Sequence, residues 1–295
     1  MVVRFSVVIP CCNEADYIAD TIKSLRAQTF RGGYEIVVVD NNCTDDTAEI
    51  ARRLGARVVA EVRQGVCPAR QRGTEASRGD IVVSADADTL YPARWLDTID
   101  ESFRVDGRVV AVAGPCRYRR GPLWGRVYGR LLFGAIDLIY RLTGRLCYAT
   151  ATNLAFWRDR WPGYDIRLTQ GGDELDLLRR LRRIGAVKYD HGNAVWTSSR
   201  RLSRGILYNI AVTLVVYYLS AYLVNRLFGR RVIGSAPLCR NDSGRRTARV
   251  RLVAVSVLVT CGLLMMFTGF GHVVTTASRS VIDEFSVLLD PDEGG

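Results

Sequence analysis

The sequence predicts an α/β protein with a mostly parallel sheet and helices on both faces. Short runs rich in valine and isoleucine alternate with segments of helical spacing from Phe5 to Ala113. The runs are apolar throughout, which is typical of strands that are covered on both faces. Aspartates follow where several runs end, as Asp40 and Asp86 do. Ligands bind at the carboxyl edge of such sheets, so we expect the functional site there.

Local patterns give the individual elements. Ile18, Ile22 and Leu25 fall on one face of the first helix, and the polar run from Thr44 to Thr47 offers the side chains that begin the second. The predicted strands are Phe5–Ile9 (which we expect Pro10 to end), Glu35–Val39, Arg57–Glu61, Ile81–Ser84, Val109–Ala113 and Thr150–Phe156. The predicted helices are Glu14–Ala27, Thr44–Leu54, Val66–Ser77, Pro92–Arg104 and Asp173–Ile184.

Composition narrows the class of protein. The 295 residues carry a net charge of +11, and only Lys23 and Lys188 are lysines, so the basic charge is almost all arginine. Arginine suits phosphate groups and anionic lipids, although a GC-rich genome explains the bias equally well. Zinc-finger spacing, RNP motifs and basic zippers are absent, so we expect no nucleic-acid partner. The eight cysteines show no Cys-x-x-Cys spacing and indicate reduced thiols.

The run Asp80–Thr89 carries the strongest chemical signal. Its apolar part, Ile81–Val83, reads as a buried strand, and Asp86 and Asp88 follow directly. Residues i and i+2 of an extended segment point the same way, so both carboxylates can address one point in space. Oxygen ligands in that arrangement suit Mg²⁺ or Mn²⁺. A lone pair of this kind is more often two solvated turn aspartates, so the other motifs decide between the two interpretations.

Two later segments, Gly205–Asn225 and Leu252–Ser278, carry no charged residue apart from His272 in the second, and each is long enough to cross a bilayer. We expect a catalytic domain over residues 1–199, a membrane-associated helical region over 200–279 with candidate helices at 206–228 and 252–275, and an acidic tail over 280–295. The arginines on both flanks of the first segment leave a spanning or an interfacial arrangement open.

Leu123–Leu142 mixes leucines and aromatics with arginines. That composition suits a helix on a membrane surface (residues 121–142) or one packed on the domain's own core. Met1 runs directly into a strand without the features of a signal peptide, so we expect the catalytic domain to face the cytoplasm at the cell membrane.

Several motifs in order resemble the family 2 glycosyltransferases of the GT-A fold. The resemblance covers roughly Val3 to Trp196, and most of the motifs lie at predicted strand ends. The segments that carry it are Val8–Glu14, Val38–Thr47, Gly65–Gly73, Asp80–Thr89, Ala151–Phe156 and Gly172–Leu177. It implies a GT-A (Rossmann-like) catalytic domain, a nucleotide-sugar donor carrying UDP or GDP, and a divalent metal, Mn²⁺ or Mg²⁺.

The resemblance also implies roles on the donor side. Asp40 would accept a hydrogen bond from the nucleobase, and Pro10 and Glu14 would bound the turn that meets base and ribose. Arg70 would bind ribose or diphosphate, with Gln71 in place of the family's asparagine. Asp86 and Asp88 would hold the metal, and Asp86 would also contact the donor. Glu14 and Asp40 can equally serve as helix-capping residues.

On the acceptor side, Asp173-Glu174 matches the family's Glu-Asp pair in reversed order. One of these carboxylates would be the base that deprotonates an acceptor hydroxyl, and we favour Asp173. Carboxylates at a helix start are also stabilised by the helix dipole alone.

Three functions compete. The first is an inverting glycosyltransferase that acts on a lipid-linked hydroxyl at the membrane. The second is a polyprenyl-phosphate glycosyltransferase similar to dolichyl-phosphate sugar synthases, whose acceptor phosphate Arg117, Arg200 and Arg201 would bind. The third is a non-catalytic membrane scaffold, against which the intact aspartates argue. The first turn lacks Gly-x-Gly-x-x-Gly, which makes a dehydrogenase a poor fit.

Overall fold

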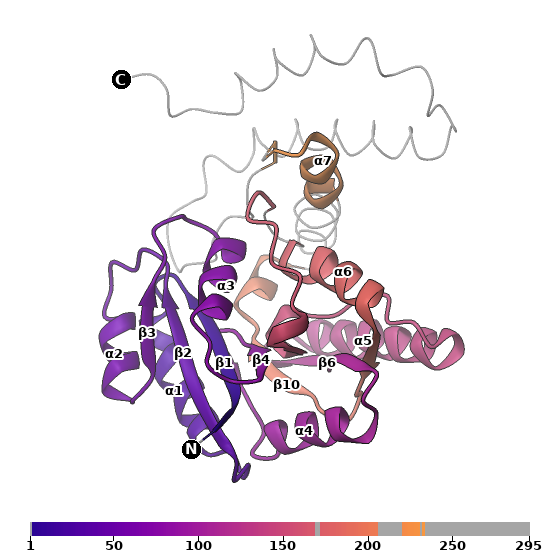
Figure 1. Cartoon of the computed structure of the whole chain (residues 1–295). Helices are drawn as coiled ribbons and strands as arrows, with labels where there is room; N and C mark the ends of the chain where they lie inside the picture. Colours follow the sequence, from indigo (N-terminus) through magenta and orange to yellow (C-terminus); the bar gives the residue numbers. More distant parts are fainter. Residues whose placement is uncertain (1, 169–171, 206–219, 231, 234–295) are drawn as a thin grey trace.

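The computed structural model describes residues 2–168, 172–205, 220–230 and 232–233. Most of these residues form one α/β unit around a seven-stranded sheet (Figure 1). In sheet order the strands are β3 (Arg57–Ala60), β2 (Gly33–Asp40), β1 (Val3–Cys11), β4 (Ile81–Ser84), β8 (Leu154–Trp157), β6 (Val109–Ala113) and β9 (Ala186–Tyr189).

The sheet is mixed. Strands β3, β2, β1 and β4 are parallel, with β1 in the middle of this half, and β6 and β9 are also parallel to each other. Strand β8 runs antiparallel to both of its neighbours, β4 and β6. The carboxyl ends of β1, β2 and β4 therefore meet at one edge, which confirms the predicted α/β fold with a mostly parallel sheet.

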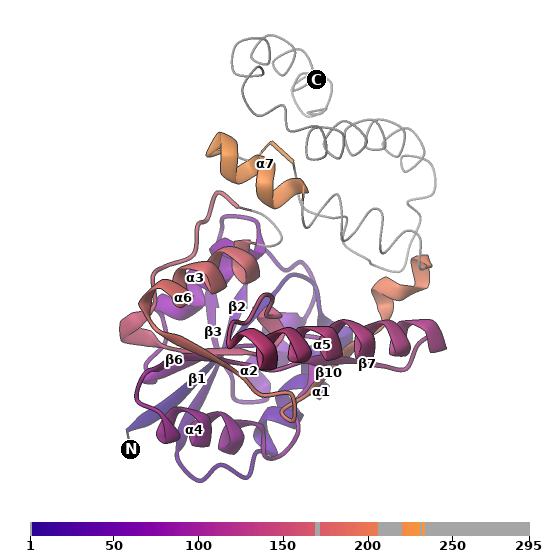
Figure 2. The same ribbon diagram turned by 90° about the vertical axis from the view of Figure 1, so that its right-hand side faces the viewer.

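Helices cover both faces of this sheet. The helices of the described part of the chain are α1 (Ala15–Arg26), α2 (Thr47–Arg53), α3 (Val66–Glu75), α4 (Trp95–Val105), α5 (Leu123–Thr143), α6 (Leu177–Ile184) and α7 (Ala221–Phe228), and α7 stands apart from the sheet. Figure 2 shows α3 and α6 on one face and α4 on the opposite one. Helix α3 lies very close to the sheet because Gly73 has no side chain, and a Cβ there would collide with Val8 and Val39.

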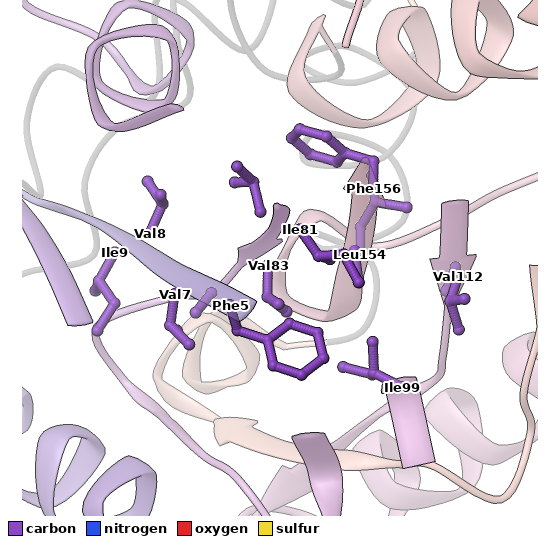
Figure 3. Close-up of a cluster of buried hydrophobic side chains, with 14 of the residues drawn as sticks. Phe5, Val7, Val8, Ile9, Ile81, Val83, Ile99, Val112, Leu154 and Phe156 are labelled. Carbon is purple, nitrogen blue, oxygen red and sulfur yellow. The ribbon is translucent and has the colours of Figure 1, made fainter. Parts of the chain in front are cut away.

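The core lies between the large sheet and these helices. Its members come from nearly every element, and ten of them are labelled in Figure 3. Phe5 and Phe156, from adjacent parts of the sheet, are fully buried. Burial of apolar area on both faces makes the strands rigid, so loops at their ends are held in fixed positions.

A second, three-stranded sheet stands beside the first. Its order is β5 (Thr89–Leu90), β10 (Val195–Ser198) and β7 (Cys116–Arg119). The side chain of Asn153, just before β8, joins the two sheets. Its Nδ2 donates to the carbonyls of Pro115 and Asn193, which precede β7 and β10, at 3.1 and 2.7 Å. Its Oδ1 accepts from the indole of Trp95 at 2.9 Å.

Strands β5, β7, β9 (Ala186–Tyr189) and β10 were not predicted from the sequence. Three of the predicted elements also differ from the expectation in an informative way. Strand β1 continues through Pro10 to Cys11, because at that point β1 pairs only with β2 and its pairing with β4 has ended at Val8. The predicted strand from Thr150 begins with a 3₁₀ turn, Ala151–Asn153, before β8. The predicted helix from Asp173 opens with a π-helical turn, Gly172–Asp176, before α6.

The two predicted membrane segments fall largely outside the described residues. Only α7, at the end of the first, is described, and residues 252–275 are not. Across the ranges that the structure describes, none of the helices combines the length and the apolar character required to cross a bilayer.

Candidate active site

The site is assembled from loops that follow β1, β2 and β4. Pro10 lies near the end of β1 and Glu14 in the turn that follows it, β2 ends at Asp40, and the loop after β4 carries Asp86 and Asp88. A backbone hydrogen bond of 2.9 Å from the Asn41 amide to the Cys11 carbonyl holds the first two loops together. The structure thus brings all the predicted donor-side aspartates to one edge of the sheet.

Arg70 is the buried centre of the site. It lies on α3, is 2% exposed, and its Nη2 is 2.6 Å from Asp86 Oδ1. Its Nη1 donates to the Ser84 hydroxyl and the Ala85 carbonyl at 2.5 and 3.1 Å. Charge-assisted bonds of this kind fix both partners. Arg70 therefore sets the direction of the Asp86 carboxylate, whose side chain is still 37% exposed.

Asp173 is the second carboxylate bound to Arg70. Its Oδ2 accepts a hydrogen bond of 2.9 Å from Arg70 Nε, and the residue is only 5% exposed. Burial raises the pKa of the Asp173 carboxyl, and the Arg70 guanidinium opposes that rise. The same neighbouring carboxylates raise the pKa of Arg70 despite its burial, so the guanidinium stays charged. The structure therefore places Asp173 in the protein interior, in contact with Arg70.

Glu174 is also buried, in a different direction. Its Oε1 accepts the Ala151 amide at 3.0 Å, and Tyr148 donates its hydroxyl to Oε2 at 3.4 Å. Glu174 is 6% exposed. Both predicted base candidates are therefore hydrogen-bond acceptors for protein groups, and their assignment as the base stays a prediction.

Asp88 lies at the junction of the two sheets. The Ser198 amide donates to its carbonyl at 3.1 Å, and the Thr197 hydroxyl donates to Oδ1 at 3.3 Å. Burial raises the pKa of the Asp88 carboxyl to about 6, and neighbouring Asp86 and Glu14 add to the rise while Arg200 opposes it. This accumulation of negative charge is the electrostatic environment that a cation relieves.

Arg200, predicted to bind an acceptor phosphate, is instead bound to the donor-side carboxylates. Its guanidinium makes two bonds to Glu14, of 2.6 and 2.8 Å, and lies 3.1 Å from Asp88 Oδ2. It also lies over the ring of Tyr17, 4.9 Å from the centroid. Sequence spacing gives no sign of this contact, because Arg200 and Glu14 are 186 positions apart.

Arg117 and Arg201 are the other arginines predicted to bind the acceptor phosphate. Arg117 is on β7, opposite Trp196 of β10, and is exposed. Arg201 is exposed, and its positive charge lowers the pKa of the Asp88 carboxyl, so it is near that group.

Asp40 Oδ1 accepts a hydrogen bond of 2.9 Å from the Cys43 amide, and this bond shapes the turn after β2.

Asp86 and Asp88 fit a hard divalent cation by donor chemistry. Both are carboxylates on one short loop, and further carboxylates, Asp173 and Glu14, share with them the arginines Arg70 and Arg200. Among the described residues no group of three or more acidic, histidine or cysteine side chains could hold a metal. The protein would thus supply two oxygen ligands, which matches the habit of Mg²⁺ of binding through one or two carboxylates and substrate phosphates.

Two residues that the sequence analysis did not single out hold the loop after β4 that carries Asp86 and Asp88. The Asp86 amide donates to the Tyr91 hydroxyl at 2.9 Å, and that hydroxyl also contacts Thr152. Tyr91 is three residues beyond Asp88, so its closeness in sequence could have indicated a role at the site, whereas nothing in the sequence around Thr152 indicates one.

An open hollow of about 630 Å³ between the Thr29–Gly32 loop and α4 lies at the opposite end of the sheet, away from these groups.

The chain is similar to curated glycosyltransferases over part of its length. An uncharacterised glycosyltransferase of Mycobacterium tuberculosis is 43% identical over 83 residues, which is 28% of this chain and 36% of the relative. The undecaprenyl-phosphate 4-deoxy-4-formamido-L-arabinose transferase of Edwardsiella ictaluri is 35% identical over 154 residues, 48% of this chain and 44% of the relative. The chain thus matches less than half the length of these curated relatives.

A solved structure is also similar. Glucosyl-3-phosphoglycerate synthase from Mycobacterium tuberculosis, in complex with Mn²⁺, UDP-glucose and phosphoglyceric acid, superposes with a TM-score of 0.49 and 26% identity, covering 68% of this chain and 74% of that one. The sequence model described as Glycosyl transferase family 2 matches residues 6–159, more than half of the chain. The chain therefore belongs to glycosyltransferase family 2, which confirms the family and the enzyme class that its motifs predicted.

Proposed function

We propose that the protein transfers a sugar from a UDP- or GDP-sugar to the phosphate of a membrane lipid at the cytoplasmic face of a membrane. The donor side rests on the family and on the cluster of Asp40, Arg70, Asp86 and Asp88. The lipid and the phosphate rest on two separate features of the structure, one on the surface and one inside the site.

The surface of α5 is the observation that carries the lipid acceptor. Its outer face exposes an apolar stripe of residues spaced by one or two helical turns, which are Leu123, Val127, Leu131, Leu138 and Leu142. Exposed Arg126 and Arg130 flank the stripe, and no acidic residue occurs between Arg108 and Ile136. A long apolar stripe bordered by arginines fits the interface of an anionic bilayer.

The position of α5 links this surface to the chemistry. Figure 2 shows α5 across the side of the domain where β7 and β10 lie. Strand β7 pairs with β10, and β10 pairs with β5, which begins directly after Asp88. A lipid head group at the bilayer surface next to α5 would thus be close to the metal-binding carboxylates.

The state of the two base candidates favours a phosphate nucleophile. A hydroxyl acceptor needs a base within hydrogen-bond reach, but Asp173 is bound to Arg70 and Glu174 to the Ala151 amide. A phosphate is already ionised near neutral pH and needs cationic groups instead. Exposed Arg117 and Arg201 offer them, with the planar fork that suits phosphate. The relative from Edwardsiella ictaluri, whose name specifies undecaprenyl phosphate, adds support.

A divalent cation held by Asp86 and Asp88 would offset negative charge on the departing nucleoside diphosphate. Side chains of the protein hold the metal-binding loop and the donor in place. Arg70 orients the Asp86 carboxylate, Tyr91 fixes the loop through the Asp86 amide, and Asp40 lies at the end of β2 to meet the base. The phosphate oxygen then displaces the diphosphate at the anomeric carbon from the opposite face, with inversion.

Transfer to lipid can be measured directly. Membranes that contain the full chain are incubated with a panel of labelled UDP- and GDP-sugars, and lipids are extracted and exposed to mild acid. We expect one donor to label a lipid whose sugar is released by the acid, because a sugar phosphate ester is acid-labile. Membranes with the Asp88→Asn variant are the control and should give no label. An acid-stable lipid product would contradict the phosphate acceptor, and a water-soluble product would contradict the lipid.

A further inference from the structure

The guanidinium of Arg200 lies between two loops that each carry a carboxylate. Arg200 is the first residue of a 3₁₀ turn, Arg200–Arg204, that follows β10. Its guanidinium binds Glu14, from the turn after β1, and Asp88, from the loop after β4. The side chains of Glu14 and Asp88 are both 13% exposed, so water screens these contacts only weakly.

The contact of Arg200 with Asp88 would compete with a metal for the same carboxylate oxygen. Arg200 Nη2 lies 3.1 Å from Asp88 Oδ2, one of the two oxygens of this side chain that could bind the metal. A divalent cation bound at about 2.0–2.2 Å from a carboxylate oxygen leaves no room for a guanidinium on the same side. Two cations so close together would also repel each other strongly.

We propose that Arg200 is a positioning residue that occupies the metal-binding carboxylates while no donor is bound and moves to the donor's diphosphate when the metal–donor complex enters. The inference rests on the proposed nucleotide-sugar donor. Arg200 keeps Glu14 and Asp88 together in the empty site, so the two acidic loops do not separate. Once released, its planar fork matches the geometry of phosphate oxygens.

The surroundings of Arg200 support movement instead of a fixed structural role. The guanidinium has two sets of acidic partners and one aromatic face, Tyr17, and its side chain is 26% exposed. Arg70, in contrast, is enclosed by Ser84, Ala85, Asp86 and Asp173. Of the two arginines on the metal carboxylates, Arg200 alone stands at the solvent side.

Metal binding without nucleotide is the first test. Mn²⁺ is titrated into the detergent-solubilised full chain and free Mn²⁺ is followed by electron paramagnetic resonance. We expect Arg200→Gln to raise Mn²⁺ affinity on the order of tenfold, within the usual range for coupled binding events. Arg108→Gln is the control, because it removes an exposed positive charge that pairs with Asp106 and not with the metal-binding carboxylates. We expect it to change Mn²⁺ affinity by no more than about twofold.

Nucleotide binding is the second test. With Mn²⁺ saturating, the affinities for UDP and GDP are measured by calorimetry. We expect Arg200→Gln to weaken the better-bound nucleotide on the order of tenfold, because a charge-assisted contact to the diphosphate is lost. The two effects have opposite signs. A residue that merely supported the fold would lower both affinities.

Tyr17→Leu provides a variant without a change in charge. It removes the ring under the guanidinium, so we expect Mn²⁺ affinity to rise in the same direction as in Arg200→Gln but less, even if Arg200→Gln fails to fold. The proposal is overturned if Arg200→Gln and Tyr17→Leu leave Mn²⁺ affinity unchanged or lower it, or if Arg108→Gln raises it equally. Failure of the wild-type chain to bind UDP and GDP with Mn²⁺ would instead overturn the proposed donor.

Discussion

Arg70 and Asp173 form an ion pair of 2.9 Å in the protein interior, although they are 103 positions apart in sequence. The pair connects α3 to the turn that opens α6. Because the same guanidinium holds Asp86, a change at Asp173 is transmitted to the metal-binding loop.

Breaking this pair from one side should be costly. We expect Arg70→Met to lower the free energy of unfolding by about 3–5 kcal/mol, because it leaves Asp86 and Asp173 without their counter-charge. The double variant Arg70→Met/Asp173→Asn should recover part of the loss. Denaturant unfolding of the detergent-solubilised chain measures both. Arg108→Met, at an exposed arginine, is the control, and equal effects in Arg70→Met and Arg108→Met would contradict the prediction.

The two base candidates, Asp173 and Glu174, can be distinguished by how much their replacement lowers the rate of sugar transfer. For a phosphate acceptor, we expect Glu174→Gln to lower the transfer rate less than about tenfold, since no proton must be removed. A hydroxyl acceptor would make the loss about 10²–10⁴-fold for the residue that serves as base. Initial rates at saturating donor and acceptor give the answer, and Asp173→Asn is measured in parallel. A loss of 10²-fold or more in Glu174→Gln with unchanged nucleotide affinity would favour the hydroxyl.

Metal dependence should follow Asp86 and Asp88. We expect Asp88→Asn to lower transfer at least about 100-fold without unfolding the chain, because a metal that neutralises the leaving group contributes several kcal/mol. Chelation by EDTA should have the same effect and should be reversed by Mn²⁺ or Mg²⁺. Thermal unfolding of the variant shows whether the fold persists. Undiminished transfer in EDTA would remove the metal from the site.

The apolar stripe on α5 should affect the lipid substrate alone. We expect Leu131→Glu to raise the KM for a lipid acceptor in vesicles about tenfold, because a buried leucine contributes about 1.5–3 kcal/mol. UDP and GDP affinity should not change. Val105→Glu, at an equally exposed apolar residue at the end of α4, is the matched control and should leave this KM unchanged. Identical KM values for both variants would indicate that α5 does not meet the bilayer.

Glu35 predicts a pH-dependent part of the stability. It is bonded to Ser6, the Arg78 amide and Arg57, and although burial raises its pKa, these bonds bring the pKa below its ordinary value. Its contribution is therefore complete above the unfolded pKa and is lost as pH falls through the folded one. We expect Glu35→Gln to cost about 1–3 kcal/mol at pH 7, with the difference from wild type shrinking below about pH 4. Thermal unfolding at both pH values measures it, and a constant difference would contradict the assignment.

The first half of the fold was predictable because its signals are local. Ile81–Ser84 and Val109–Ala113 are contiguous apolar runs with polar ends, and the structure has both strands with those bounds. Strand β8 was predictable as a strand but not as an antiparallel member between β4 and β6. Its direction depends on the path of the chain between distant elements, which local periodicity does not contain.

The same distinction holds for the site. Asp86 and Asp88 were recognisable since two carboxylates follow one strand, whereas the partners of Glu14 and Asp173 come from far along the chain. Arg200 shows the limit most clearly. Its residue type suggested a phosphate ligand, but its actual neighbours depend on how β10 pairs with β5.

The side chain of Asn153 connects two sheets whose loops can change independently. In the proposed function the large sheet binds the nucleotide and the small sheet faces the acceptor, and the Asn153 amide binds Trp95, Pro115 and Asn193 between them. Loops on the small sheet and the length of α5 can therefore diverge to suit new acceptors without disturbing the donor half, provided that this amide is kept. Replacement by leucine would leave the Trp95 indole and the carbonyls of Pro115 and Asn193 without this partner and would weaken the connection between the sheets.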